Sequence, residues 1–123
     1  MQETPLGKFL RQHRVKMNYS QRAFASLIGV SESYLSRIEN GTSSPSNSAL
    51  LKKLSEALNL TPNLAASLIF AAQTSQRVLQ LPEGLCTAGY STAHLFVQTI
   101  LSLQDEDFLQ IESICKKYQI KEN

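Results

Sequence analysis

Five polar side chains between positions 31 and 37 could form hydrogen bonds with the edges of nucleic-acid bases. Serine and glutamate side chains can bond to base edges in a DNA groove, and one arginine can bind both O6 and N7 of a guanine. The candidate base-reading residues are Ser31, Glu32, Ser33, Ser36 and Arg37. To act together they must lie on one exposed helix face, so the rest of that helix needs a scaffold behind it.

The residues around this stretch have the spacing of two short helices joined by a tight turn. Ala25 is small enough for two helices to approach closely, and Gly29 tolerates a positive φ. Leu35 and Ile38 would anchor the second of the two helices inward. The polar residues 31–37 then point outward, which is how such a pair of helices presents one of them to the major groove.

The stretch Ser20–Gly41 closely resembles the helix-turn-helix of the phage-repressor-like family, the Cro/C1/Xre-type transcriptional regulators. It has Ser-Gln at the start of one helix, Ala-x-x-x-Gly-Val-Ser through the turn and Ile-Glu-Asn-Gly at the end of the next. Pro45 and a leucine-rich segment follow. The resemblance covers about residues 5–72 and implies a five-helix domain that binds double-stranded DNA.

The resemblance also implies roles for residues outside the base-reading face. Gln21 occupies a place where the family contacts a phosphate or an outer base, and Asn40 occupies a place where the family's loop contacts phosphate. Arg14 and Glu39 match a pair that forms an ion bridge between the first and third helices. Such phosphate contacts set the register of a protein on DNA rather than its sequence preference. The full set of expected phosphate contacts is Gln21, Arg22, Asn40, Thr42, Ser43 and Ser44.

Glu32 departs from the glutamine that the family often has at this place, and two interpretations stay open. Its carboxylate either accepts a hydrogen bond from a cytosine amino group, or it stabilises the start of the helix and faces solvent. Tyr34 also has two interpretations, a contact with a thymine methyl or sugar and packing at the edge of the domain.

Apolar residues recur at intervals of three and four along almost the whole chain, which predicts an all-α fold. We expect a five-helix Cro/C1-type helix-turn-helix domain followed by a C-terminal two-helix extension. The first helix runs from about Pro5 to Met17. The second follows Ser20 and has Phe24, Ala25, Leu27 and Ile28 on its core face, and the third runs from Ser31 to Asn40-Gly41.

Ser46 is expected to cap the fourth helix, and Thr61-Pro62 opens a fifth that continues towards Leu79. Residues 81–90 form a connector between this domain and the last two helices, which span about 91–103 and 105–118.

Charge divides the chain of 123 residues into two parts. Residues 1–75 carry eight basic and four acidic side chains, whereas residues 76–123 carry four basic and six acidic ones. The first part therefore suits phosphate, and the second suits a different partner. We expect a DNA-binding domain over residues 1–75 and a helical C-terminal extension over residues 76–123.

The C-terminal extension has apolar stripes too wide for two helices to cover by themselves. The expected dimer or partner surface consists of Leu95, Phe96, Ile100, Phe108, Ile111 and Ile114. Homodimerisation is the leading interpretation, because two reading helices one DNA turn apart match a palindromic site. Packing back on the same chain and docking of an antagonist protein or ligand are the alternatives.

Other classes of function find little support in the sequence. Cys86 and Cys115 have no C-x-x-C neighbour and are expected to be small core residues, and His13 and His94 do not have metal-ligand spacing. No nucleophile has a recognisable base partner, so we expect neither enzyme activity nor a metal or other cofactor. Without a membrane span or a leader-like N-terminus, a cytoplasmic location is expected.

The sequence thus predicts a transcriptional regulator, a repressor that binds a palindromic operator as a homodimer. The alternative is a protein-interaction module such as an antitoxin, whose C-terminal helices bind a partner protein while DNA binding serves autoregulation. A co-purifying protein would favour the alternative.

Overall fold

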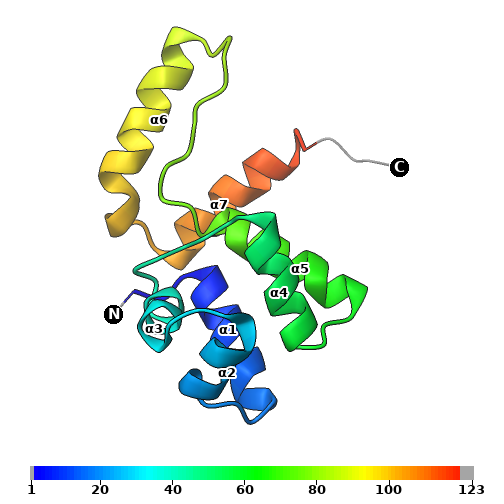
Figure 1. Cartoon of the computed structure of the whole chain (residues 1–123). Coiled ribbons are helices and arrows are strands. Elements are labelled where there is room, and N and C mark those ends of the chain that lie inside the picture. Colours follow the sequence, from blue (N-terminus) through cyan, green and yellow to red (C-terminus); the bar gives the residue numbers. More distant parts are fainter. Residues whose placement is uncertain (1, 120–123) are drawn as a thin grey trace. The chain divides into compact units, whose positions relative to one another are not determined.

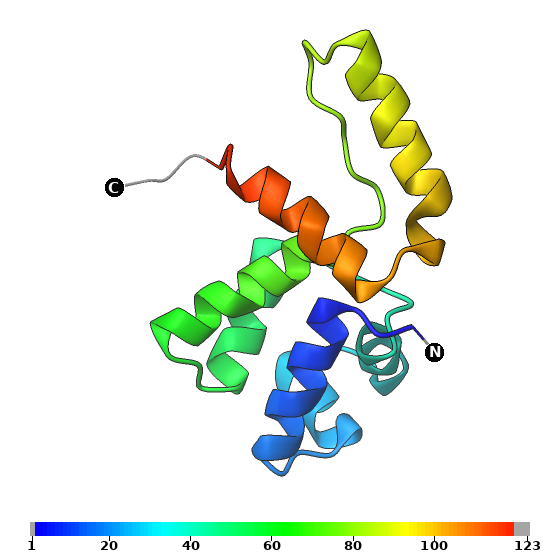
Figure 2. The same ribbon diagram turned by 180° about the vertical axis from the view of Figure 1, so that it is seen from behind.

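The computed structural model describes residues 2–119, and all regular structure in that range is helical (Figures 1 and 2). The first five helices are α1 (Pro5–Lys16), α2 (Gln21–Ile28), α3 (Glu32–Glu39), α4 (Ser48–Ala57) and α5 (Pro62–Thr74). They are followed by α6 (Thr87–Thr99), the short 3-10 helix η1 (Ile100–Ser102) and α7 (Asp105–Lys116). The predicted all-α fold is confirmed.

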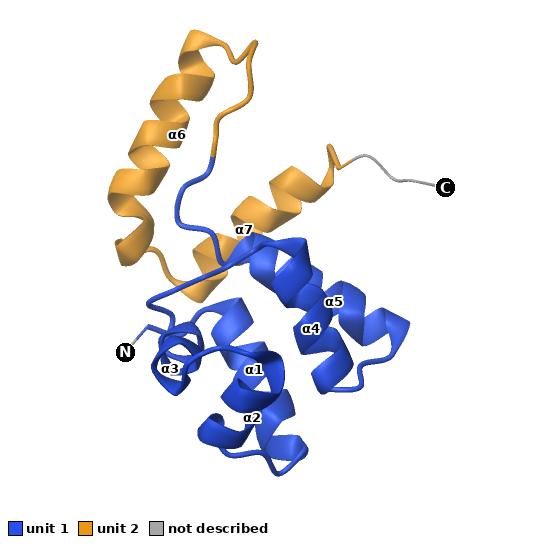
Figure 3. Cartoon of the chain, viewed as in Figure 1, with its two compact units in different colours: residues 1–79 blue, residues 80–123 orange. Residues whose placement is uncertain are grey.

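The chain divides into two units, residues 1–79 and residues 80–123 (Figure 3). The first unit contains α1 to α5, and the second contains α6, η1 and α7. Each unit is described here by itself.

Short polar side chains begin the helices of the first unit. The Ser20 hydroxyl accepts the Ala23 N–H at 3.0 Å, the Ser31 hydroxyl accepts the Tyr34 N–H at 3.0 Å, and Thr61 caps α5 at Leu64. These three caps confirm the sequence predictions, because each side chain satisfies an N–H that has no partner within its helix. The prediction of Ser46 as the cap of α4 is wrong, since the Asn47 amide oxygen accepts the Leu50 N–H at 2.7 Å instead.

One hydrophobic core holds the first unit together. Helix α1 packs against α3 and α5, α2 packs against α3 and α4, and α4 packs against α5. Each of the five helices contributes at least one fully buried side chain. These are Leu6, Leu10, Phe24, Leu35, Ile38, Leu54 and Leu68.

Two predictions about the first unit are wrong. Leu27 is 54% exposed. Phe24, Ala25 and Ile28 form the inward face of α2, and Leu27 points away from that face. Helix α5 ends at Thr74 rather than continuing towards Leu79. At that end the Ser75 N–H bonds back only three residues, to Ala72, while the Ser75 hydroxyl accepts the Leu6 N–H from α1 at 2.8 Å.

The helices of the second unit also differ from their expected bounds. Helix α6 begins at Thr87, inside the expected connector, because the Cys86 sulfur accepts the Gly89 N–H and this glycine lies within the first turn of the helix. It gives way to η1 at Ile100, and α7 ends at Lys116. Cys86 and Cys115 are both exposed, so their prediction as core residues is wrong.

None of the residues in α6, η1 or α7 is buried. Leu95 is 59% exposed, Ile114 is 57% exposed, and Phe96 and Phe108 are half-buried. The apolar faces of α6 and α7 do not pack lengthwise on each other. Their apolar stripes are therefore covered only in part.

Candidate nucleic-acid interface

The joint between α2 and α3 has the backbone geometry that its residues predict. Gly29 adopts φ 75° and ψ 32°, a left-handed conformation that costs glycine little. The Val30 N–H bonds to the Ala25 carbonyl at 3.0 Å, and Ala25 itself is buried. Only three residues, Gly29 to Ser31, separate α2 from α3, and this short turn fixes the direction of α3.

Helix α3 is held from one side only. Leu35 and Ile38 are fully buried, whereas Glu32, Ser33 and Arg37 are exposed. The Ser31 hydroxyl is engaged in capping the helix, and Glu32 lies in the first turn. The structure thus brings Glu32, Ser33 and Arg37 together on the outer face. Ser31 lies at the edge of this face, and its hydroxyl oxygen already accepts one hydrogen bond from the Tyr34 N–H.

Arg37 is supported by the aromatic ring next to it. The guanidinium carbon lies 5.5 Å from the centre of the Tyr34 ring, and that ring packs against the hydrophobic core. A cation over an aromatic face is attracted electrostatically at this distance. A guanidinium carries its N–H groups in a planar fork, which can bind a guanine with two hydrogen bonds.

A buried ion pair joins α1 to α3. Arg14 donates from Nε to Glu39 Oε2 at 2.7 Å and from Nη2 to Oε1 at 3.0 Å, and its Nη1 donates to the Tyr19 carbonyl. The two side chains are 11% and 4% exposed. This two-bond contact fixes the C-terminal end of α3 relative to α1 and to the start of α2.

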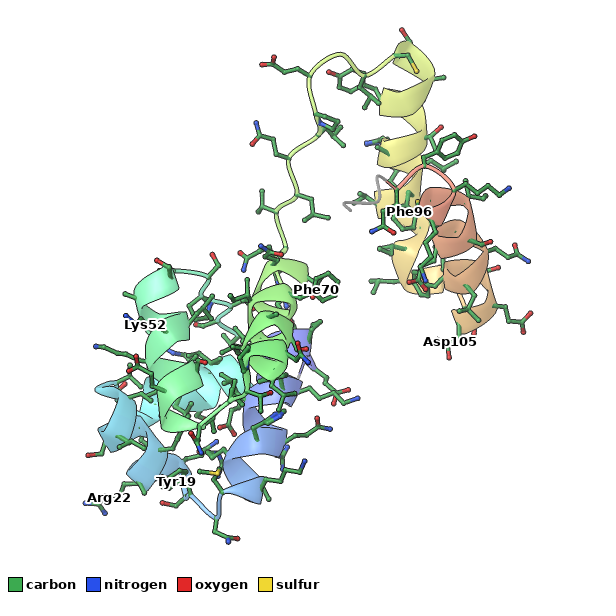
Figure 4. All side chains as sticks on the ribbon, turned by 90° about the vertical axis from the view of Figure 1, so that its right-hand side faces the viewer. Tyr19, Arg22, Lys52, Phe70, Phe96 and Asp105 are labelled. Carbon is green, nitrogen blue, oxygen red and sulfur yellow. The ribbon has the colours of Figure 1, made fainter. Side chains whose placement is uncertain are left out.

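Gln21 belongs to the same network, which the sequence did not indicate. Its Nε2 donates to Glu39 Oε1 at 3.1 Å, so the amide group is oriented by the ion pair. An amide nitrogen has two N–H groups, and the second is left to donate to another acceptor. Arg22, the next residue, is exposed and points away from α2 in Figure 4.

The side chains around this network line a polar hollow on the surface of the first unit. Its lining residues are Arg11, Arg14, Gln21, Ser36, Glu39 and Asn40. Ser36 is half-buried, and it lines the hollow from the α3 side. Sequence reasoning missed Arg11, although its place three residues before Arg14 sets the two arginines on one face of α1.

The loop after α3 is folded by its own hydrogen bonds. The N–H groups of Thr42 and Ser43 both donate to the Arg37 carbonyl, and the Thr42 hydroxyl donates to Asn40 Oδ1 at 2.6 Å. These donors are therefore occupied. The Asn40 amide nitrogen and the hydroxyls of Ser43 and Ser44 are the donors that this loop can offer to an anion.

Within residues 2–119, no three His, Cys, Asp or Glu side chains come together in a way that could bind a metal ion. None of the helices in that range has the length and apolar character needed to cross a membrane.

Comparison with known protein families gives one result. A family model for a helix-turn-helix matches residues 10–64, which run from within α1 to the start of α5. No curated protein and no solved structure gives a significant match to the chain. The matched segment contains α2, the turn at Gly29 and α3 in full.

Proposed function

We propose that this chain, in which residues 10–64 form a DNA-binding helix-turn-helix domain of the phage-repressor-like family, is a repressor that binds a palindromic operator as a homodimer. The family match supports the coarser statement, a DNA-binding transcriptional regulator of the Xre type. Repression, the palindrome and the dimer are our proposal.

The observation that carries the proposal is the outer face of α3. Glu32, Ser33 and Arg37 are exposed together on a helix that is held from behind by the core and by the ion pair of Arg14 and Glu39. A polar helix face on a rigid support is what reading of base edges in the major groove requires. We assign base reading to Ser31, Glu32, Ser33, Ser36 and Arg37.

The hollow at the start of α2 supports a phosphate contact beside this helix. Arg11 supplies a positive charge, and Gln21 and Asn40 each offer an amide N–H. The carboxylate of Glu39 faces the same hollow, but it is neutralised by Arg14. With Arg22, Ser43 and Ser44, these residues form the proposed phosphate-contacting set. Thr42 uses its N–H and hydroxyl within the loop, so its expected role becomes that of holding Asn40 in place.

Dimerisation follows from the second unit. The residues that we assign to the dimer surface are Leu95, Phe96, Ile100, Phe108, Ile111 and Ile114, and none of them is buried in the single chain. A two-fold dimer turns two copies of α3 towards two half-sites about one DNA turn apart, so the operator would mirror the symmetry of the protein. A bound dimer of this kind excludes other proteins from the DNA that it covers.

Selection of binding sites from random DNA tests the proposal. The full-length chain should enrich an inverted repeat whose half-site centres lie about 10–10.5 base pairs, or a multiple of that, apart. The Arg37→Ala variant should enrich a motif that is degenerate at one base pair in each half-site. Recovery of random sequence with the unchanged chain would overturn the proposed function, and recovery of unpaired half-sites would overturn the dimer.

A further inference from the structure

The loop after α3, residues 40–44, is held at each end by a group from a distant part of the first unit. At its start, the Gln2 N–H donates to the Asn40 carbonyl at 3.1 Å. At its end, the Gln76 amide nitrogen donates to the Ser44 carbonyl at 3.0 Å. Gln2 and Gln76 lie outside residues 10–64, so the family match does not account for either contact.

A glycine lets the chain before α1 lie directly on this loop. Gly41 is buried and adopts φ 83°, and a Cβ atom added there would collide with the Gln2 carbonyl oxygen and come within 3.0 Å of the Thr4 methyl. Thr4 is fixed in turn, because its hydroxyl caps α1 by accepting the Gly7 N–H at 3.1 Å. Residues 2–4 therefore form a strap from the start of α1 across the end of α3, and the ribbon follows this course in Figures 1 and 2.

The Gln76 side chain is fixed at the end of α5. Its amide nitrogen also donates to the Ala72 carbonyl at 2.9 Å, so both of its N–H groups are used. The residue before it, Ser75, is buried and accepts the Leu6 N–H at 2.8 Å, which ties this end of α5 to α1. Gln76 therefore links the 40–44 loop to a part of the domain that is itself anchored to the core.

Between these two contacts, the loop carries donors that we assign to phosphate. The Thr42 N–H and hydroxyl both donate to Asn40 Oδ1, which orients the Asn40 amide group and leaves its nitrogen as a donor. Ser43 and Ser44, which supply the hydroxyls, are half-buried. A loop whose donors are already in place loses less conformational freedom when it binds an anion. The order of this loop therefore contributes to its affinity for phosphate.

We infer that Gln2 and Gln76 are positioning residues for DNA binding, which act by holding the 40–44 loop in the conformation that contacts phosphate. The inference rests on the phosphate contacts in the proposed function and names the groups that order them. Phosphate contacts carry no sequence information. Loosening the loop should therefore weaken binding to every duplex by the same factor and leave the preferred sequence unchanged.

Gln76→Met tests the contact at the end of the loop, because methionine has a similar length but no N–H donor. Its dissociation constants for the operator and for a scrambled duplex should rise alike, by about tenfold, the effect of one lost hydrogen bond to a charged group. Gln73→Met is the matched control, since Gln73 is exposed near the end of α5, and should change neither constant. Circular dichroism checks that both variants keep their helix content.

Removing the hydroxyls of the loop shows whether Gln76 acts through them. In a chain that already carries Ser43→Ala and Ser44→Ala, adding Gln76→Met should raise the dissociation constants by no more than about twofold, within the scatter of independent effects. A purely structural role predicts the same tenfold loss in both chains. An equal loss would therefore overturn the positioning role.

Gln2→Pro tests the contact at the start of the loop, because proline has no N–H to donate to the Asn40 carbonyl. Gln2→Ala is its control, since alanine keeps the N–H and removes only the side chain. Hydrogen exchange of the Thr42 and Ser43 amides, measured without DNA, should become about tenfold faster in Gln2→Pro and Gln76→Met and stay unchanged in the two controls. Unchanged exchange in both variants would contradict the inference.

The outcomes separate this inference from the proposed function. Equal binding of both duplexes by Gln76→Met and the unchanged chain would overturn the inference, while the proposed function would stand on the site selected by the unchanged chain. A loss confined to the operator would make Gln76 a determinant of sequence preference and would also overturn the inference. An unchanged chain that binds neither duplex would overturn both.

Discussion

At the scale of single residues, the candidate DNA-binding face contains side chains that are oriented before any DNA is bound. Tyr34 supports Arg37 from beneath, and Glu39 orients both Arg14 and Gln21. A side chain that is already held in place loses less conformational freedom on binding. The interior of the domain thus determines how its surface groups are presented.

Arg37→Ala should weaken binding to the selected operator by about 5- to 150-fold per half-site, from about 1–3 kcal/mol for a two-bond contact with a guanine. Binding to unrelated DNA should change little, because a base contact adds nothing on non-specific sequence. Titrations against the operator and a scrambled duplex at one salt concentration measure the difference. Arg22→Ala is the matched control and should weaken both duplexes alike. An equal loss for Arg37→Ala on both duplexes would make it a phosphate contact.

Ser75→Ala should lower the free energy of unfolding of the first unit by about 1–3 kcal/mol. The Ser75 hydroxyl is buried, accepts the Leu6 N–H at 2.8 Å and donates to the Ala71 carbonyl at 2.7 Å. Its removal leaves a buried N–H without an acceptor. Urea unfolding followed by circular dichroism measures the change. Thr74→Ala removes a hydroxyl from an exposed residue next to it and should have a much smaller effect.

At the scale of elements, the helix-turn-helix depends on how closely α1 approaches α3. Gly7 lies on α1 where a Cβ atom would come within 2.6 Å of the Glu39 carbonyl oxygen and 2.7 Å of the Ile38 carbonyl oxygen. Both oxygens belong to the backbone and cannot rotate away. The absence of a side chain at Gly7 therefore allows the two helices to meet where the ion pair of Arg14 and Glu39 forms.

Gly7→Ala should destabilise the first unit and weaken operator binding, even though alanine favours a helix over glycine by roughly 1 kcal/mol. Overpacking typically costs about 1–3 kcal/mol, and here the added methyl meets backbone atoms. Thermal unfolding and operator titration of the variant should both show the loss. Lys8→Ala, at the next and exposed position of α1, is the control and should leave stability nearly unchanged. A Gly7→Ala chain more stable than the original would show that α1 and α3 are not in close contact.

Local features of these elements could be predicted from the sequence, and distant ones could not. Ser20, Ser31 and Gly29 act on groups within a few residues, so their types and spacing were sufficient to place α2, the turn and α3. Ser75 and Leu6 are 69 positions apart, and neither residue type identifies the other as its partner. The bond from Gln21 to Glu39 is similar, since an amide at the start of a helix has many acceptors to choose from. The assigned base and phosphate contacts remain predictions.

At the scale of the whole molecule, the two units differ in how they bury apolar surface. The first unit has a core to which all five of its helices contribute, whereas the helices of the second bury none of their residues. Figure 4 shows labelled aromatic side chains in both, Phe70 on α5 and Phe96 on α6. The first unit can therefore be expected to fold without the second, and the second gains most from a partner.

A chain that ends at Leu79 should remain helical and should run as a monomer where the full-length chain runs as a dimer. The shortened chain keeps Gln76, whose amide donates to the Ser44 carbonyl at 3.0 Å and so holds the loop after α3. Sedimentation of the two chains at micromolar concentration measures their assembly directly. Circular dichroism of the shortened chain checks that its five helices are intact.

The same comparison on DNA separates reading from assembly. Because joining two half-site contacts raises the apparent affinity by about a hundredfold or more, the shortened chain should bind the palindrome far more weakly. Its affinity for a single half-site should match that of the full-length chain, since α2 and α3 are unchanged. The dependence of binding on salt should become shallower, because fewer phosphates are neutralised in each complex. Equal affinity of both chains for the palindrome would mean that the second unit does not hold two copies together on DNA, and that its apolar stripes serve a different partner.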